Sequence, residues 1–345
     1  MTRVGLVLGA GGVVGQAYQA GVLAALEDVL GWDPRTAELI VGTSAGSVTG
    51  TSLRMGVGAA DLASMAAGAP LSSEGERLYA RFLPDSSELP VPPRGSWLRP
   101  WRLPSAALVA RAARRPLAFR PSVAAAVLLP AGRVRLEGRA APLHDLVGGE
   151  WPDGLWICAV RRRDGHRVVF GRPGSPPADL APAVLASCAI PGYFSPVAIG
   201  GEEYIDGGVH SGTNADALRS QGLEVVVAVS PMSSARPHRR RADGAIRWSG
   251  HRRLAREALR VAEGGSVVVR FEPGASVLDA MGLRMMANDR SDRVVDRAMA
   301  ETRAQIEDEG LRHLLAPGRT RPTAATAPSP APGQDASSVR PRTGR

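Results

Sequence analysis

The sequence predicts an α/β fold built on a parallel sheet, and three observations lead to that prediction. Two short apolar segments, Arg3–Gly9 and Glu38–Gly42, have the length of buried strands, and Gln16–Leu30 between them has helical spacing of its apolar residues. A strand–helix–strand order with apolar strands is typical of a parallel sheet. With 345 residues, of which 44% are hydrophobic, the chain can bury a core without disulfides or metals.

The uncharged segment Val4–Leu26 could also be taken for a signal peptide or a membrane span. Glycines recur in it from Gly9 to Gly21, and the polar residues Gln16 and Gln19 lie near its middle. A spanning helix prefers a more continuous apolar run. The better interpretation is therefore a strand, a glycine turn and a helix, and no other stretch has the character of a membrane span.

The rest of the chain continues the alternation of strands and helices. A helix is expected from Ala45, directly after the second strand. Leu155–Val160 and Arg167–Phe170 are expected to pair, because Asp164-Gly165 between them is a turn signal. The remaining expected elements are strands at Val225–Val229 and Val267–Phe271, and helices at Leu180–Cys188, His251–Glu263 and Ser291–Leu315.

Two segments depart from this alternation. Pro70–Pro142 is rich in Pro, Arg and Ala without a strong strand, and it is interpreted as an inserted cap of short helices (residues 70–142). From Ala316 onward the chain is Pro, Ala, Thr, Ser and Arg, which cannot bury enough apolar surface to become ordered. We therefore expect one domain over residues 1–315 and a disordered tail over residues 316–345.

Positive charge is concentrated in three segments. All 42 basic residues are arginine, the formal net charge is +9, and the segments are Leu89–Leu136, Arg236–Arg260 and Ala316–Arg345. The first has nine arginines and no acidic residue, and it also contains Trp97 and Trp101. Aromatic residues among positive charges suit an anionic bilayer surface, whereas a solvated cap remains the competing interpretation. Nothing in the sequence resembles a nucleic-acid-binding fold.

The pentad Gly42-Thr43-Ser44-Ala45-Gly46 follows the apolar strand directly. A Gly-x-Ser-x-Gly pentad at a strand-to-helix turn is a nucleophile elbow, in which the serine stands above the edge of the sheet. The N-terminus of the following helix favours negative charge that develops there. Ser44 is therefore the candidate nucleophile, and an ordinary Gly/Ser turn is the competing interpretation.

A glycine-rich segment, Gly9–Gly15, follows the first strand. Such glycines free backbone N–H groups to face an anion, as in a dinucleotide cradle or an oxyanion hole. The dinucleotide fingerprint requires glycine where this chain has Val14, and an acidic residue ending the second strand. An oxyanion hole is therefore preferred over a nicotinamide or flavin site.

A third motif, Asp206-Gly207-Gly208, follows the expected strand residues Glu203-Tyr204-Ile205. On its own it could be a simple turn. The order of the motifs does not match an α/β-hydrolase, because Ser44 follows only the second strand. None of the six histidines has a motif that marks a catalytic base, although His210 lies near Asp206 in the sequence.

Together, the three motifs resemble the patatin-like phospholipase family, over about residues 3–230. The segment Ala186–Val197 is also similar to the family's approach to its catalytic aspartate. The resemblance implies a three-layer patatin-like fold with a central, mostly parallel sheet and a helical cap insertion. The departures that affect substrate preference and rate include Ala10 in place of the family's first glycine, Val14 in place of its basic residue, and the segment Ser211–Ala215, which lacks the usual proline.

The resemblance implies a serine acyl-ester hydrolase with a Ser–Asp dyad, in which Ser44 attacks and Asp206 accepts its proton. The implied oxyanion hole is formed by the N–H groups of Gly11, Gly12 and Val13. Glycines that support the motifs are Gly9, Gly15, Gly42, Gly46, Gly207 and Gly208. The alternative is a non-catalytic lipid- or nucleotide-binding protein on the same fold.

The expected partner is a lipid or ester substrate, with peripheral contact to an anionic membrane left open and no nucleic acid. We expect a cytoplasmic protein, with the inner membrane face as the place of any such contact. No cofactor or metal is expected, because Cys158 and Cys188 are far apart in the sequence and no histidine pair has ligand spacing. The two cysteines also exclude a disulfide framework.

Overall fold

The computed structural model describes residues 2–82, 103–114, 120–136, 150–236 and 241–313. The predicted tail, and the residues Trp97 and Trp101 of the predicted cap, lie outside the described residues. Within the described part of the chain, no helix is both long and apolar enough to cross a bilayer. The segment Val4–Leu26 forms the predicted strand, glycine turn and helix instead.

A central sheet is formed by eight strands in the described residues, with the pairing order β5-β6-β3-β2-β1-β7-β8 and β4 on the free side of β3. The pairs among β1, β2, β3, β7 and β8 are parallel, whereas β4, β5 and β6 pair in the antiparallel sense. The predicted mostly parallel sheet is confirmed. The bounds are β1 Val4–Leu8, β2 Leu39–Thr43, β3 Leu155–Arg161, β4 His166–Phe170, β5 Val197–Ile199, β6 Glu202–Asp206, β7 Val225–Val229 and β8 Val267–Phe271.

Two strands meet end to end along one edge of β3. β2 runs parallel to β3 and ends with Thr43 opposite Cys158, whereas β6 runs antiparallel and ends with Asp206 opposite Ala159. Both lie on the same side of β3, because β4 occupies its other side over these residues. The carboxyl ends of β2 and β6 therefore face each other at two consecutive residues of β3.

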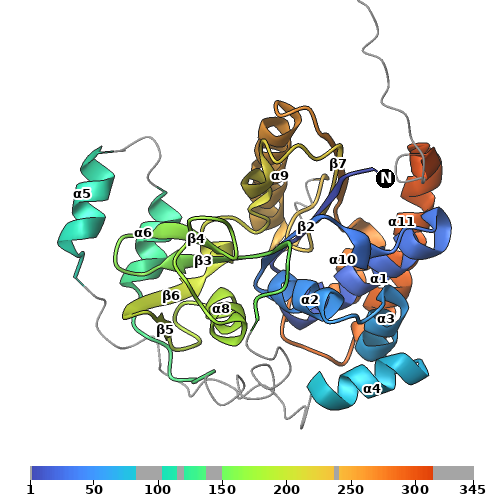
Figure 1. The fold of residues 1–345 in the computed structure, drawn as a ribbon, viewed down its shortest axis with the longest axis horizontal. Helices are drawn as coiled ribbons and strands as arrows, with labels where there is room; N and C mark the ends of the chain where they lie inside the picture. The colour runs from blue at the N-terminus through green and yellow to red at the C-terminus, as the bar shows by residue number, and fades with distance from the viewer. Residues whose placement is uncertain (1, 83–102, 115–119, 137–149, 237–240, 314–345) are drawn as a thin grey trace, which may run out of the picture.

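Helices cover both faces of the sheet, which confirms the predicted three layers (Figure 1). One face packs against α1, α2, α3, α8, α10 and α11, and the other against α9 and a 3-10 turn. These elements span α1 Gly12–Leu30, α2 Ala45–Arg54, α3 Ala59–Ala67, α8 Leu180–Ser187, α9 Gly244–Ala262, α10 Ala275–Met281, α11 Ser291–Asp308 and the 3-10 turn Ala215–Leu218. Further 3-10 turns are Pro34–Thr36, Gly207–Val209 and Leu311–His313.

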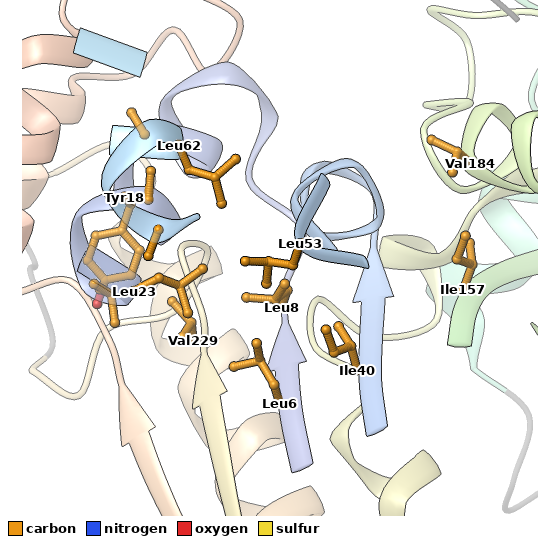
Figure 2. Packing of buried hydrophobic residues seen from close by; sticks show 14 of the residues in the cluster. Leu6, Leu8, Tyr18, Leu23, Ile40, Leu53, Leu62, Ile157, Val184 and Val229 are labelled. Carbon is orange, nitrogen blue, oxygen red and sulfur yellow. The ribbon is translucent and has the colours of Figure 1, made fainter. Parts of the chain in front are cut away.

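The larger core lies between the strands and α1, α2 and α3 (Figure 2). Leu6 and Leu8 of β1 are fully buried and point toward Leu53 of α2 and Leu23 of α1. Burying a leucine side chain completely contributes about 1.5–3 kcal/mol to the free energy of unfolding. These contacts fix β1 and β2 beneath the N-terminal ends of α1 and α2, where the glycine-rich segment and the Ser44 turn lie.

Three short helices lie in the segment predicted as a cap, namely α4 Ser73–Phe82, α5 Ala106–Arg114 and α6 Pro121–Leu128. α4 lies on one side of the molecule, and α5 and α6 lie on the opposite side (Figure 1). α4 begins next to α3, where Asp61 accepts hydrogen bonds from the backbone and hydroxyl of Ser72. α5 and α6 pack through Leu108, Val123 and Val127 on β3 and β6. The short helices were predicted, and an inserted cap over residues 70–142 stays a prediction.

Element bounds differ from the sequence prediction at two long helices. α9 begins at Gly244 rather than His251, and α11 ends at Asp308 rather than Leu315. Gly310 adopts a left-handed φ of 61° shortly after α11, a conformation that ends helices. The short elements α3 and β5 have too few periodic residues to be predicted from the sequence.

Candidate active site

Ser44 occupies a strained turn between β2 and α2. Its φ of 53° and ψ of −120° lie in a region that side-chain-bearing residues rarely adopt. A Cβ atom at Gly46 would lie 1.9 Å from the carbonyl oxygen of Leu8, and one at Gly42 would lie 2.6 Å from that of Gly46. The turn therefore requires glycine on both sides of Ser44.

Two serine hydroxyls hold the backbone of this turn. Ser187 Oγ accepts a hydrogen bond from the Ser44 N–H at 2.8 Å and donates one to the Cys158 carbonyl at 2.7 Å. Ser47 Oγ donates to the Ser44 carbonyl at 2.7 Å. The first of these links the turn to β3, so the position of Ser44 is tied to the strand that β6 also pairs with.

Asp206 ends β6 and reaches the Ser44 side chain, with which it forms a hydrogen bond. Its Oδ1 also accepts a hydrogen bond from the Gly208 N–H at 2.6 Å. Gly207 approaches β3 so closely that a Cβ there would lie 2.2 Å from the Cys158 carbonyl oxygen. The structure thus brings together Ser44 and Asp206, which lie far apart in the sequence.

Burial raises the pKa of Asp206 to about 6, although the hydrogen bonds from Gly208 and Ser44 act in the opposite direction. The carboxylate is therefore ionised at neutral pH but more basic than an ordinary aspartate. The neighbouring Cys188 thiol is neutral, because burial and the charge of Asp206 raise its pKa to about 12. Cys188 is accordingly not a competing nucleophile at neutral pH.

The glycine-rich segment lies beside the Ser44 turn at the start of α1. Its Gly9 and Ala10 N–H groups donate to the carbonyls of Val229 and Gly212. Gln19 Nε2 donates to the Gly9 carbonyl at 2.6 Å, and its Oε1 accepts from the Thr49 hydroxyl of α2 at 2.6 Å. Gln19 is completely buried, so it fixes the segment relative to α2.

Close packing explains several glycines of this segment. A Cβ at Gly11 would lie 2.6 Å from the Gly15 Cα, and one at Gly12 would lie 2.6 Å from the Met285 carbonyl oxygen. Gly12 also has a left-handed φ of 61°. In the described part of the chain, the N–H groups of Gly11, Gly12 and Val13 have no hydrogen-bond acceptor, whereas Val14 donates to Met285.

A cavity of about 470 Å³ opens over Ser44 and Asp206. Its wall combines the candidate catalytic groups with apolar side chains from α6, α9 and the segment before α11. Asp206 and Arg253 are the charged residues in the described part of this wall. Gly11 and Gly12 line this cavity, whereas Val13 lines a separate cavity between α1, α2 and α3. The wall includes Gly11, Gly12, Ser44, Asp206, Ile246 and Met285.

Asn214 connects the Ser44 turn with the loop after Asp206. Its Nδ2 donates to Thr43 Oγ1 at 3.1 Å and to the carbonyl of Gly207 at 3.4 Å. Its Oδ1 contacts His210 Nδ1 at 3.0 Å. Burial, together with the charges of Arg167 and Arg120, lowers the pKa of His210 to about 3, so this imidazole is neutral at pH 7.

Sequence reasoning missed the supporting role of Ser187 and Asn214. Ser187 lies in the segment Ala186–Val197 that carries the family resemblance, but its bridge from Ser44 to Cys158 depends on the pairing of distant strands. Asn214 has a left-handed φ of 53°, which asparagine tolerates better than most residues. Only a prediction of strand register could have located either residue at the site.

Among the described residues, no group of three or more His, Cys, Asp or Glu side chains could hold a metal ion. The two cysteines are both free, Cys158 within the sheet core and Cys188 beside the Ser44 turn. The polar groups described at the site include the Ser44 hydroxyl, the Asp206 carboxylate and the backbone N–H groups of the glycine-rich segment.

The protein thus combines a three-layer α/β fold with a strained serine at a strand-to-helix turn and a buried aspartate in the same cavity. The family model described as patatin-like phospholipase matches residues 6–219. The chain belongs to the patatin-like phospholipase family, as the sequence motifs predicted. The family supports lipid acyl hydrolase activity in general. No curated protein sequence matches the chain.

Several solved structures are similar to the chain, among them the following three. VipD from Legionella pneumophila is 13% identical with a TM-score of 0.39, and the match covers 89% of this chain and 67% of VipD. The type III effector ExoU is 16% identical with a TM-score of 0.35, over 90% of this chain and 54% of ExoU. In a complex of ExoU with SpcU from Pseudomonas aeruginosa, the matched chain is 18% identical with a TM-score of 0.34, and the match covers 89% of this chain and 51% of that chain. The chain thus spans about two thirds of VipD and about half of the other two chains.

Proposed function

We propose that the protein is a serine acyl-ester hydrolase of lipids, with Ser44 as nucleophile and Asp206 as general base. The observation that carries the proposal is the meeting of β2 and β6 at consecutive residues of β3, which brings the two side chains together. An isolated aspartate is a weak base for a serine hydroxyl. The raised pKa of Asp206 makes it a stronger base than an ordinary aspartate, and a base is most effective when its pKa lies near the working pH.

In the first step, Ser44 Oγ attacks the ester carbonyl carbon while Asp206 accepts the hydroxyl proton. The tetrahedral intermediate collapses, its C–O bond breaks, and the leaving alcohol takes the proton from Asp206. Water then attacks the acyl-enzyme with Asp206 again as base, which releases the carboxylic acid and restores the Ser44 hydroxyl.

The oxyanion donors are the backbone N–H groups of Gly11 and Gly12, with Val13 as a third candidate. Support comes from the absence of acceptors for these groups in the described part of the chain, and from the position of both glycines on the cavity wall. Losing one such donor costs about 10²–10³ in kcat. The N-terminus of α1 adds its partial positive charge at the same point.

The test of the dyad combines hydrolysis with active-site labelling. We expect Ser44→Ala to lose at least about 10³-fold in the hydrolysis of p-nitrophenyl esters and to escape labelling by a fluorophosphonate. Asp206→Asn keeps the shape of the side chain but should lose about 10²–10⁴-fold, because the amide cannot accept the proton. Cys188→Ser serves as a control for a second nucleophile and should retain labelling.

A protein that binds lipid or nucleotide without catalysis would not be labelled by the fluorophosphonate. The wild-type chain would then behave like Ser44→Ala in both assays. Circular dichroism of each variant shows whether loss of activity comes with loss of fold. Unlabelled but folded wild-type protein would overturn the proposed activity.

The proposal includes a lipid surface as the source of substrate, with peripheral contact at the inner membrane face. Ile246 lines the catalytic cavity and is 63% exposed, and Leu283, close in sequence to the wall residue Met285, is 61% exposed. Exposed apolar side chains at the mouth of a cavity favour contact with a bilayer. The predicted contribution of Trp97 and Trp101 concerns residues outside the described part of the chain.

Ile246→Ser tests this contact. We expect a severalfold higher KM for phospholipid in vesicles and a smaller change in the KM for a soluble short-chain ester, because only the first substrate requires the surface. Val109→Ser is the matched control, since Val109 is similarly exposed (57%) but lies on α5, outside the cavity wall. Equal effects of the two variants would contradict a contact at the cavity mouth.

A further inference from the structure

A second cavity, of about 570 Å³, lies on the other side of the loop that follows Asp206. His210 lines this second cavity, whereas its sequence neighbours Val209 and Ser211 line the catalytic one. The walls come from β3, β4, α5 and the turn after β4. The second cavity contains neither Ser44 nor Asp206, and no step proposed above uses it.

Arginine dominates the wall of the second cavity. Its guanidinium groups come from Arg111, Arg161, Arg167 and Arg172, and two further wall residues are His166 and His210. Among the residues that the structure describes, no aspartate or glutamate lines it. A wall of this composition presents donors from several directions and no negative charge to a bound group.

Two of the four guanidinium groups are neutralised by carboxylates outside the wall. Arg161 pairs with Asp164 at 2.7 Å, and Arg167 pairs with Asp216 at 2.6 Å. These partners hold both arginines in place and leave their remaining donors for another acceptor.

The other two arginines, Arg111 and Arg172, have no carboxylate partner among the described residues. Arg111 donates to the backbone carbonyl of Asp164 at 3.1 Å, and Arg172 lies over the Trp156 ring at 5.7 Å. Both therefore contribute uncompensated positive charge to the same cavity. Like charges held close together repel each other, and a bound anion relieves that repulsion.

Burial and the positive charge of the wall lower the pKa values of its two histidines. Burial and then Arg111 lower the pKa of His166, and burial and then Arg167 lower that of His210. Both imidazoles are neutral at pH 7 and can donate or accept a hydrogen bond.

We infer that the second cavity binds a phosphate monoester through Arg111, Arg161, Arg167 and Arg172. A phosphate monoester carries nearly two negative charges at pH 7 and has three acceptor oxygens, which matches two uncompensated guanidinium groups and several converging donors. The planar guanidinium binds such a group through two parallel hydrogen bonds. The ester can belong to a soluble compound or to the headgroup of a lipid.

The binding test uses the full chain with Ser44→Ala, so that no lipid is consumed and the result does not depend on the proposed activity. Calorimetric titration with sn-glycerol 3-phosphate or inorganic phosphate should show saturable binding that weakens with added salt, and glycerol should not bind. Arg172→Gln should weaken the affinity about tenfold or more, because it removes a charge-assisted contact. Arg172 is exposed, so this variant should fold; Arg111→Gln should act in the same direction.

Arg163→Gln is the matched control, because it removes one positive charge from the same strand region outside the cavity wall, where Arg163 pairs with Glu202 on the surface. It should change the affinity by less than about twofold. Absence of saturable phosphate binding, or an equal loss in Arg163→Gln and Arg172→Gln, would overturn the inference.

The source of the phosphate is found with vesicles. Phosphatidylcholine vesicles containing phosphatidic acid carry a phosphate monoester, whereas those containing phosphatidylserine carry negative charge without one. Co-sedimentation that prefers phosphatidic acid and is lost in Arg172→Gln identifies a lipid headgroup. Binding of soluble glycerol phosphate with no such preference identifies a soluble ligand.

Discussion

The Ser44 turn and the Asp206 loop reach the same point of the molecule but are held by different forces. Steric exclusion dominates at the turn, because Gly42 and Gly46 have no room for a Cβ, and the hydrogen bonds of Ser187 and Ser47 add to it. In the loop after Asp206, only Gly207 is packed as tightly, and the residues that follow are held by side-chain hydrogen bonds, above all those of Asn214. A single methyl group added at Gly42 or Gly46 should therefore cause a large loss of stability and activity. Removal of hydrogen bonds from the loop should cause smaller, stepwise losses.

Gly46→Ala should have the largest effect on either region. The added Cβ would lie 1.9 Å from the Leu8 carbonyl oxygen, so β1 or α2 must shift. We expect a loss of about 3 kcal/mol or more in the free energy of unfolding and no detectable hydrolysis. Urea denaturation and the p-nitrophenyl ester assay measure the two effects.

The control for Gly46→Ala is Gly58→Ala. Gly58 has a negative φ of −69° and open space around its Cα, so the change should cost less than about 1 kcal/mol. Similar stability of the two variants would show that steric exclusion does not hold the Ser44 turn.

Removing the Asn214 side chain should weaken the loop without unfolding the protein. Asn214→Gly keeps the left-handed backbone accessible but removes the hydrogen bonds to Thr43 and Gly207. We expect about 2 kcal/mol of lost stability and about 10–100-fold slower fluorophosphonate labelling of Ser44. Asn214→Ala should be less stable than Asn214→Gly by about 1 kcal/mol, because alanine adds strain at positive φ.

If Asn214→Gly labelled Ser44 at the wild-type rate, the hydrogen bonds of this residue would not position the loop. Gln221→Ala is the control, since the Gln221 side-chain amide donates to the nearby Arg219 carbonyl on the surface.

The raised pKa of Asp206 gives a prediction for pH. Because the base must be ionised, kcat/KM should fall about tenfold per pH unit below a midpoint near 6, with the midpoint set by the pKa of about 6. The raised pKa also means that the folded protein binds the proton more tightly than the unfolded chain. The stability contribution of Asp206 therefore falls as the pH rises from about 4 through 6.

Asp206→Asn should consequently be more stable than the wild type at pH 8, by up to about 3 kcal/mol, with the difference shrinking toward pH 4. Urea denaturation at the two pH values measures it. A variant that is inactive and destabilised at both values would mean that burial of the charge is not what raises the pKa.

His210→Gln should have the smallest effect. His210 contacts Asn214 and is neutral at pH 7, and it lines the second cavity rather than the catalytic one. We expect less than about threefold loss of kcat/KM and an unchanged midpoint of the pH profile. A His210 variant as inactive as Asp206→Asn would indicate a triad and contradict the dyad.

The two regions also differ in how well the sequence predicts them. The pentad around Ser44 is a local steric requirement, so its position and conformation could be predicted from five consecutive residues. The link between Asp206 and Ser44 depends on the register of β2 and β6 against β3, which no local pattern encodes. The family resemblance supplied that link, whereas the roles of Ser187 and Asn214 arise from contacts between residues more than a hundred positions apart.

The end-to-end meeting of β2 and β6 has a consequence for how such a site can change during evolution. The interval between Thr43, which directly precedes Ser44, and Asp206 is one residue step along β3, about 3.3 Å, and it does not depend on the length of any connection. Insertions between β2 and β3, or between β4 and β5, can therefore change the residues around the site while this interval stays the same. A residue inserted between Cys158 and Ala159 of β3 would move Ser44 and Asp206 apart. Changes in sequence length that keep the site intact are therefore expected in the connections between strands.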